Sequence, residues 1–413
     1  MKMRLAKLSA ALLAVFAVNN AYAAEVNCSQ SYGIQSTVNG IVGQTYCDNN
    51  SQTFIDLVKK LKDSNPNYNE TAVTEVMGRF NDADITMNYR DSSTTLEFSS
   101  PDLGVEKQTF TGATRKESQD MFVDWLKKSG IITQVMQYQS KNSANSPITG
   151  SAGLMPTLAR NDFDTATEST SNVANTSKME TVSGNLVGLG LNVGSYSIAG
   201  GEKVDTATLP LSYTKKMASD PRKQLIFTVP ISMYQVGSAK GYHVGLGLAY
   251  RFPVNDRWTL TPAARYAVTG SVDRATVASV ISGSLTSTYT IPLDQFELTV
   301  ANMVGYYSTG KFKAGEYSFN PKIKETMLRN GVMLSQPFYL KGKKLAAEYS
   351  VIDTRYVGSN KPFMSNMQEY GVTVGLHKDE AENNPKLSNI RVGVTYMHGK
   401  GSKGFTANMG YWF

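Results

Sequence analysis

The chain has 413 residues and a formal net charge of +7, with 41% apolar and 18% charged residues. This mild positive excess gives no reason to expect nucleic-acid binding. After the first two dozen residues, no apolar run reaches the ~20 residues that a membrane-spanning helix needs, which excludes an inner-membrane helical protein.

The first 23 residues have the three parts of a secretory signal peptide. Lys2, Arg4 and Lys7 form a positive start, an apolar run follows over 8–18, and an Ala-Tyr-Ala cleavage site ends the segment. The apolar run is too short to cross a bilayer as a helix. We therefore expect an exported protein whose mature chain begins near Ala24.

Both cysteines of the chain, Cys28 and Cys47, lie close to the start of the mature region. Export places them in an oxidising compartment, so we expect a disulfide that closes this short loop. The alternative is a lipid-modified Cys28. The residues before it, Glu25, Val26 and Asn27, are not the small ones that such processing requires.

Residues 24–140 combine helix-like and strand-like patterns. Apolar residues recur at helical spacing over 54–61 and again at Val73, Val76, Met77 and Phe80. Three short strand-like pieces follow between Asp84 and Thr111, and a capping-box spacing opens a helix from Thr114 to Lys128. The sequence predicts a small N-terminal α+β domain.

Residues 141–183 are rich in Ser, Thr, Asn and Gly and contain Pro147 and Pro156. This composition is typical of a loop or a linker.

From residue 184 to the end, apolar residues alternate with small or polar residues, the pattern of strands that have two different faces. Over 242–252, for example, Tyr242, Val244 and Leu246 share one face, and His243 and Gly245 share the other. The predicted strands number about twelve and run ~10 to 14 residues, close to the length that crosses a bilayer when tilted. A mainly β fold, with a transmembrane antiparallel β-barrel over 184–413, is the prediction.

The expected turn lengths agree with a membrane barrel whose C-terminus lies in the periplasm. The tight connections over 253–256, 292–294 and 339–343 all fall on the periplasmic side. The longest connection, over 309–325, falls outside, where longer loops are expected. The connections over 215–222 and 378–386 are longer than this rule favours.

The last residues carry the most specific signal. Phe405, Ala407, Met409, Tyr411 and Phe413 lie on one face of the final strand, and the sequence given stops at an aromatic residue. Here the sequence resembles the superfamily of outer-membrane barrels of Gram-negative bacteria. The resemblance implies that Tyr411 and Phe413 are read by the barrel-assembly machinery, and that outer-membrane lipid surrounds the barrel. A soluble edge strand that ends by chance in aromatic residues is the alternative.

Ionisable residues on the other face of the strands are expected to line the lumen. Their charges are of mixed sign, which favours mutual ion pairs over ion selectivity and leaves the guidance of solutes as the alternative. They are His243, Arg251, Arg265, Glu297, Glu348, Glu369 and Arg391.

No local pattern indicates an enzyme, a cofactor or a metal. His243 and His377 are expected to face the lumen, and His398 lies at a strand end. None has the close Ser or Asp neighbour of the barrel hydrolases or proteases. Three separated histidines and one cysteine pair offer no ligand spacing for a metal.

A barrel of about twelve strands must be filled by side chains, by a plug or by water. The helix over 114–128, or the linker that follows it, is a candidate plug. This arrangement resembles autotransporter translocators, although the exported part here is short, lacks repeats and contains a cysteine pair. The sequence leaves three functions open: a channel for small solutes, a translocator-like surface anchor and an outer-membrane hydrolase. It does not indicate an oligomeric state.

Overall fold

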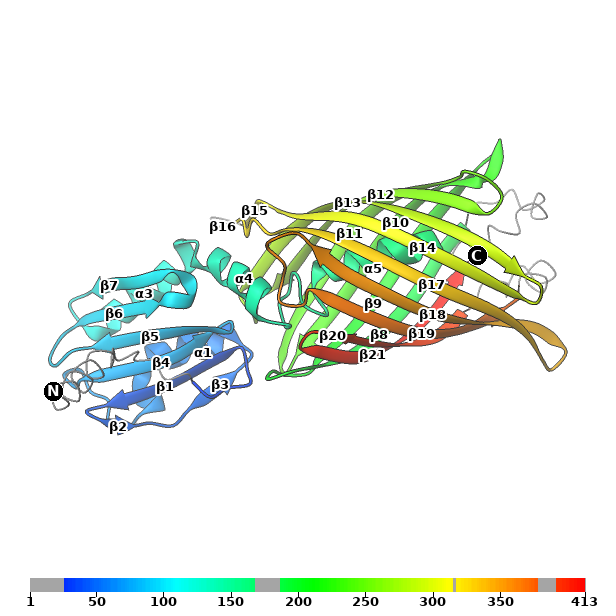
Figure 1. The fold of residues 1–413 in the computed structure, drawn as a ribbon. Helices are drawn as coiled ribbons and strands as arrows, with labels where there is room; N and C mark the ends of the chain where they lie inside the picture. Colours follow the sequence, from blue (N-terminus) through cyan, green and yellow to red (C-terminus); the bar gives the residue numbers. More distant parts are fainter. Residues whose placement is uncertain (1–25, 168–185, 315–316, 378–390, 413) are drawn as a thin grey trace, which may run out of the picture.

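The computed structural model describes residues 26–167, 186–314, 317–377 and 391–412. The predicted signal peptide and Phe413 lie outside the described residues. The chain forms a small sheet domain followed by a closed barrel, and the two lie end to end (Figure 1). Among the described residues, no helix combines the length and apolarity needed to cross a membrane.

The N-terminal domain is a seven-stranded antiparallel sheet in the order β2-β1-β4-β5-β6-β7, with β3 paired to β1. Helices pack against the sheet, and an aromatic cluster that includes Phe98, Phe122 and Trp125 lies between them. The disulfide between Cys28 and Cys47 is present. The elements are β1 (Tyr32–Val38), β2 (Ile41–Val42), β3 (Tyr46–Asp48), α1 (Ser51–Lys59), α2 (Leu61–Ser64), β4 (Thr74–Phe80), β5 (Ala83–Tyr89), β6 (Thr95–Ser100), β7 (Val105–Thr111), α3 (Arg115–Lys128) and α4 (Ile131–Asn142).

Two local predictions for this domain have different outcomes. The helix over 114–128 is confirmed as α3: Thr114 Oγ1 accepts from the Glu117 amide, and Glu117 Oε2 accepts from the Ala113 amide. The helical interpretation of the segment around Val76 is wrong, because the segment forms strand β4. Val76 and Phe80 are buried and alternate with less buried neighbours, so a period of two governs these residues.

The second part is a closed antiparallel barrel of twelve strands, which confirms the predicted fold class. β8 pairs with β9 on one side and with β21 on the other, so the sheet has no free edge. A short hairpin of β15 (Phe312–Ala314) and β16 (Tyr317–Phe319) lies outside the barrel sheet. The strands are β8 (Leu186–Ile198), β9 (Val204–Met217), β10 (Asp220–Val236), β11 (Ala239–Pro253), β12 (Trp258–Ser271), β13 (Thr276–Leu293), β14 (Phe296–Gly310), β17 (Lys324–Leu340), β18 (Lys343–Val357), β19 (Asn366–Leu376), β20 (Arg391–Gly399) and β21 (Ser402–Trp412).

The outer surface of the barrel is apolar. Leu246, Ile281 and Val351 face outward with 63%, 58% and 54% of their surface exposed, whereas inward-facing neighbours such as His243 and Thr261 are buried. Some exposed aromatic residues lie near strand ends on the outer face, such as Tyr242, Phe296 and Tyr339. Tyr396 contacts Tyr370 and Phe405 on the neighbouring strands. An apolar band between aromatic girdles is the surface that a bilayer requires.

The N-terminal domain packs against the end of the barrel opposite to the end where β8 begins and β21 ends (Figure 1). The Ser51 amide donates to the Asp273 carbonyl (2.6 Å), and Asn81 Nδ2 donates to the Arg274 carbonyl (3.0 Å). Both acceptors belong to the β12–β13 connection, so the domain lies over this mouth of the barrel.

Candidate functional site

A helix of the chain itself occupies the lumen. This helix, α5 (Leu154–Thr167), lies within the segment whose composition predicts a linker, and it runs inside the barrel (Figure 1). Near its start, the Ala152 carbonyl lies 3.0 Å from His243 Nε2. Near its end, the Thr165 and Ala166 carbonyls accept from Arg251 at 2.6 Å and 2.9 Å. The chain therefore enters from the N-terminal domain and crosses toward the end where β8 begins.

Asp162 fixes α5 to one wall of the barrel. Its Oδ1 accepts from Arg265 Nε, and its Oδ2 accepts from Ser284 Oγ at 2.9 Å and from Tyr307 OH at 3.4 Å. The Asp162 and Arg265 side chains are each 1% exposed. A buried carboxylate is stable only when it is paired and hydrogen-bonded, and both conditions hold here.

A second charged group ties the helix to another part of the wall. Arg160 Nε donates to Glu369 Oε1 at 2.9 Å, and Glu369 also accepts from Arg329, which donates to Thr354 Oγ1 at 2.7 Å. The Arg329 guanidinium lies 5.0 Å from the centre of the Phe163 ring on α5, a cation–π distance. Two acidic and three basic side chains therefore hold the helix at two places.

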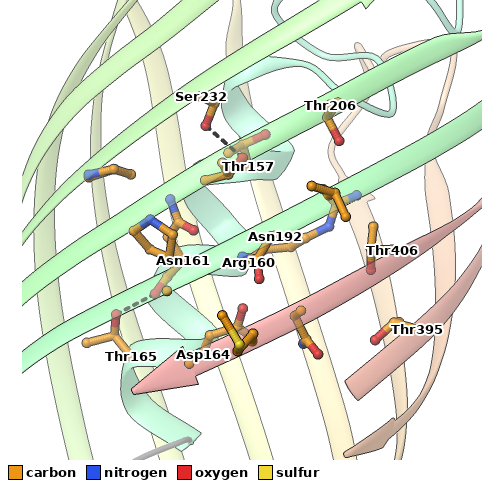
Figure 2. Close-up of a pocket in the computed structure, with 18 of the residues that line it drawn as sticks. Thr157, Arg160, Asn161, Asp164, Thr165, Asn192, Thr206, Ser232, Thr395 and Thr406 are labelled. Atoms are coloured by element: carbon orange, nitrogen blue, oxygen red, sulfur yellow. Dashed lines mark hydrogen bonds between the residues drawn. The ribbon is translucent and has the colours of Figure 1, made fainter. Parts of the chain in front are cut away.

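A cavity of about 290 Å³ remains beside α5, between the helix and the wall that includes β8–β10 and β19–β21. Figure 2 shows strand hydroxyl groups and the helix residues Asn161 and Asp164 around this space. Most of these groups are neutral hydrogen-bonding groups, so the cavity suits water or a small polar solute. The labelled lining residues are Thr157, Arg160, Asn161, Asp164, Thr165, Asn192, Thr206, Ser232, Thr395 and Thr406.

A buried apolar cluster lies at the end of the cavity toward the N-terminal domain. Its members lie near the ends of the strands on that side, and Ala152, just before α5, packs against them. This cluster and α5 lie between the polar cavity and the mouth that the N-terminal domain covers. The cluster consists of Tyr196, Val204, Tyr234, Val236, Met364, Met367 and Met397.

The predicted lumen residues take different positions. His243, Arg251, Arg265 and Glu369 contact α5 or the residues just before it, as described above. Glu348 forms an ion pair with Arg391, and both line the cavity. Glu297 lies on the inward face of β14 by the alternation of that strand.

Other predicted residues lie at or next to strand ends. His377 follows the end of β19, where its amide donates to the Lys344 carbonyl at 3.0 Å, and His398 is exposed near the end of β20. Tyr411 pairs with Leu189 through the backbone of β21. The role of Tyr411 in barrel assembly stays a prediction.

Sequence reasoning missed Arg160, Asp162 and Arg329. Arg329 shares the inward face of β17 with Met327 and Gly331, so strand alternation could have found it. The two α5 residues were missed because the Ser- and Thr-rich composition favoured a linker. The apolar residues Met155, Leu158 and Ala159 are at helical spacing and could have indicated the helix.

Ser232 and His243 are not arranged as a catalytic pair, and the described residues contain no metal site. The strand register places Ser232 opposite His243, but His243 Nδ1 has no hydrogen-bond partner and Ser232 Oγ accepts from Thr208 instead. A Ser–His nucleophile requires a hydrogen bond between the two side chains. No group of three His, Cys, Asp or Glu residues that could hold a metal occurs among the described residues.

No family model matches the chain, and no curated protein has a significantly similar sequence. Among solved structures, the barrel is similar to the β domain of the Bordetella autotransporter BrkA, with 15% identity over 55% of this chain and 98% of that chain (TM-score 0.42). It is also similar to the translocator domain of the autotransporter NalP from Neisseria meningitidis, with 14% identity over 63% and 97% of the two chains (TM-score 0.40). An outer membrane channel from Pseudomonas putida F1 has 10% identity over 55% and 94% (TM-score 0.37). The likeness is one of fold alone.

The closed sheet, the exposed apolar band with aromatic ends and the polar interior define a class of protein. The chain is a transmembrane β-barrel of the outer-membrane type.

Proposed function

We propose that the protein is a self-plugged outer-membrane anchor that displays its N-terminal domain on the cell surface. The observation that carries this proposal is the path of the chain through the lumen. Because α5 crosses the barrel, the N-terminal domain and the start of β8 lie at opposite ends. Domain and barrel are thus joined through the pore itself, as in a translocator that has kept its cargo attached.

The charged contacts of α5 favour a helix that plugs the barrel permanently, and they argue against a segment that is only in transit through the lumen. If the helix withdrew, Arg265 would lose Asp162 and Glu369 would lose Arg160. Removing one partner of such a pair is costly, so the helix is expected to stay in place.

Several turn lengths support the outer side for the N-terminal domain, although the connection over 378–386 at the opposite end is longer than the rule favours. At the end where β8 begins, the β9–β10, β13–β14 and β17–β18 connections are tight turns, such as Lys341–Gly342 with positive φ at both residues. At the other end, the β14–β17 connection is long enough to contain the β15–β16 hairpin. Outer-membrane barrels have short periplasmic turns and longer extracellular loops.

Epitope accessibility in intact cells tests this proposal. One epitope is inserted in the β1–β2 turn at Asn39–Gly40, and a matched control epitope is inserted at Lys341–Gly342. We expect antibody to bind the first epitope on intact cells and the second only after the outer membrane is permeabilised. The opposite pattern would place the N-terminal domain in the periplasm and overturn surface display.

A channel for small solutes is the second candidate function. The polar cavity beside α5 favours it, because its hydroxyl and amide lining provides hydrogen bonds to water or to a small polar molecule. A channel requires the apolar cluster around Met367 and Met397 to open, or α5 to move. Conductance distinguishes this function from the anchor, as described at the end of the Discussion.

A further inference from the structure

A polar strip crosses the lipid-facing surface of the barrel. Its residues lie on five adjacent strands, β13, β14, β17, β18 and β19, and each is the direct cross-strand neighbour of the next. All of them belong to the outward-facing set of their strands. The polar strip consists of Ser287, Asn302, Asn330, Asp353 and Gln368.

The middle of the strip lies within the apolar band. Asn302 shares the outward face of β14 with Phe296 toward one end and Tyr306 toward the other, which are 40% and 49% exposed. On β17, Asn330 lies between Leu328 and Val332, which are 37% and 46% exposed. Exposed apolar neighbours on both sides show that the two asparagines face the hydrocarbon region.

The two asparagines satisfy only part of each other's hydrogen-bonding capacity. Asn302 Nδ2 donates to Asn330 Oδ1 at 2.8 Å, and both side chains are exposed. A carboxamide has two donor hydrogens and an acceptor oxygen. Within the described part of the chain, Asn302 Oδ1 and Asn330 Nδ2 have no partner. Hydrocarbon cannot supply one, so a polar group in this position marks contact with something other than lipid.

We propose that the polar strip is the contact between two copies of this chain in the membrane. The asparagine pair is self-complementary: about a two-fold axis, Asn330 Nδ2 of one copy donates to Asn302 Oδ1 of the other, and the reverse bond forms as well. Such a reciprocal arrangement is the rule for a two-fold interface. Side-chain hydrogen bonds of this kind join membrane segments where the hydrophobic effect does not.

The charges beside the asparagines do not oppose this pairing. Asp353 Oδ2 accepts from Arg355 Nε at 2.8 Å, and Asp353 Oδ1 accepts from Gln368 Nε2 at 2.7 Å. This group of one acid and one base has no net charge. A second copy that presents the same group therefore meets no like-charge repulsion, whereas a strongly charged partner protein would gain nothing here.

Cross-linking in native outer membranes tests the contact. The two cysteines of the chain form a disulfide, so Asn330→Cys introduces the single free thiol. With a short bifunctional maleimide, we expect a product of twice the chain mass. The matched control is Leu246→Cys, which is also lipid-facing and 63% exposed but lies on β11, and it should stay monomeric.

A mass measurement completes the test. In a mild detergent, the unaltered protein should have the mass of two chains, and Asn302→Leu/Asn330→Leu should have the mass of one while it retains the heat-modifiable migration of a folded barrel. Equal cross-linking at Asn330→Cys and Leu246→Cys, or an unaltered protein that is a monomer, would overturn the proposal. A cross-linked product of any other mass would assign the strip to a different protein and would overturn it equally.

Discussion

Asp162 on α5 and Arg265 on β12 form an ion pair inside the barrel, and each side chain is 1% exposed. Asp162→Ala leaves the guanidinium without its carboxylate in a site shielded from water. We expect a loss of about 3 to 5 kcal/mol in the free energy of unfolding, measured by urea denaturation in detergent. The double variant Asp162→Ala/Arg265→Met removes both charges and should recover most of this loss. A double variant that is as unstable as the single one would contradict the ion-pair account.

The fit of α5 against the wall depends on the absence of a side chain at Gly331. A Cβ atom placed there would lie 2.8 Å from the Phe163 ring. Gly331→Val should therefore displace α5 from the barrel wall and lower the free energy of unfolding by about 1 to 3 kcal/mol. Channel openings should become more frequent. Phe163→Ala in the same chain should relieve the clash. Identical conductance of Gly331→Val and the unaltered protein would show that α5 does not close the lumen.

The disulfide stabilises only the N-terminal domain. Cys28 and Cys47 are 19 residues apart in the sequence. For a loop of this size, reduction of the disulfide is expected to lower the free energy of unfolding by about 3 kcal/mol. Trp125 fluorescence, recorded in a Trp258→Phe/Trp412→Phe background, reports on this domain, because the Trp125 ring packs against Phe98 and Phe110. Dithiothreitol should lower the midpoint of the fluorescence transition. The heat-modifiable migration of the barrel should not change, because residues 184–413 contain no cysteine. A loss of barrel migration on reduction would contradict this assignment.

Acid should weaken the open face of the N-terminal sheet. A hydrogen bond from Lys107 is the largest cause that lowers the pKa of Glu97, and Arg90 adds to it. The pKa of Glu97 in the folded protein lies below its unfolded value of about 4.3. The ion pairs of Glu97 therefore stabilise the folded domain fully above the unfolded pKa, and this stabilisation is lost as pH falls through the folded pKa. Surface pairs contribute at most about 1 kcal/mol. Urea midpoints at pH 7 and pH 3 should therefore differ less in Glu97→Gln than in the unaltered protein, and an equal difference would exclude Glu97 as the cause.

Ser232 and His243 face each other across β10 and β11 and permit a direct test of the hydrolase alternative. Because the described residues include no hydrogen bond between the two side chains, we expect Ser232→Ala and His243→Ala to leave lipid and peptide hydrolysis unchanged. Purified protein and outer membranes are both assayed. Loss of a measurable hydrolysis in both variants would restore the enzyme to the candidate functions.

The barrel could be predicted because its signal is local. Alternation along β11, from Tyr242 to Arg251, is visible in the sequence, and it follows from a wall that separates lipid from a polar lumen. The helical prediction for Val73, Val76, Met77 and Phe80 failed because a match to helical spacing over eight residues is weak evidence. Only Val76 and Phe80 share the buried face of β4, and Met77 lies on the opposite face. The sheet partners β1 and β5 decide the outcome.

The linker was a predicted candidate for the plug, but its contacts with the wall could not be predicted in the same way. Asp162 lies more than 100 residues before each of its partners in the sequence, and no local pattern joins them. The partners are Arg265, Ser284 and Tyr307. The polar side chains of α5 suit the interior of this barrel because the lumen wall is itself polar. In a soluble helix the same composition indicates solvent exposure.

Single-channel conductance tests the central claim most directly. The full-length protein and a version that lacks residues 24–183 are refolded and inserted into planar bilayers. If α5 seals the lumen, the truncated barrel should conduct steadily and the full-length protein should stay closed apart from rare openings. Steady conductance of equal size in both proteins would contradict the plug and would favour a channel for small solutes.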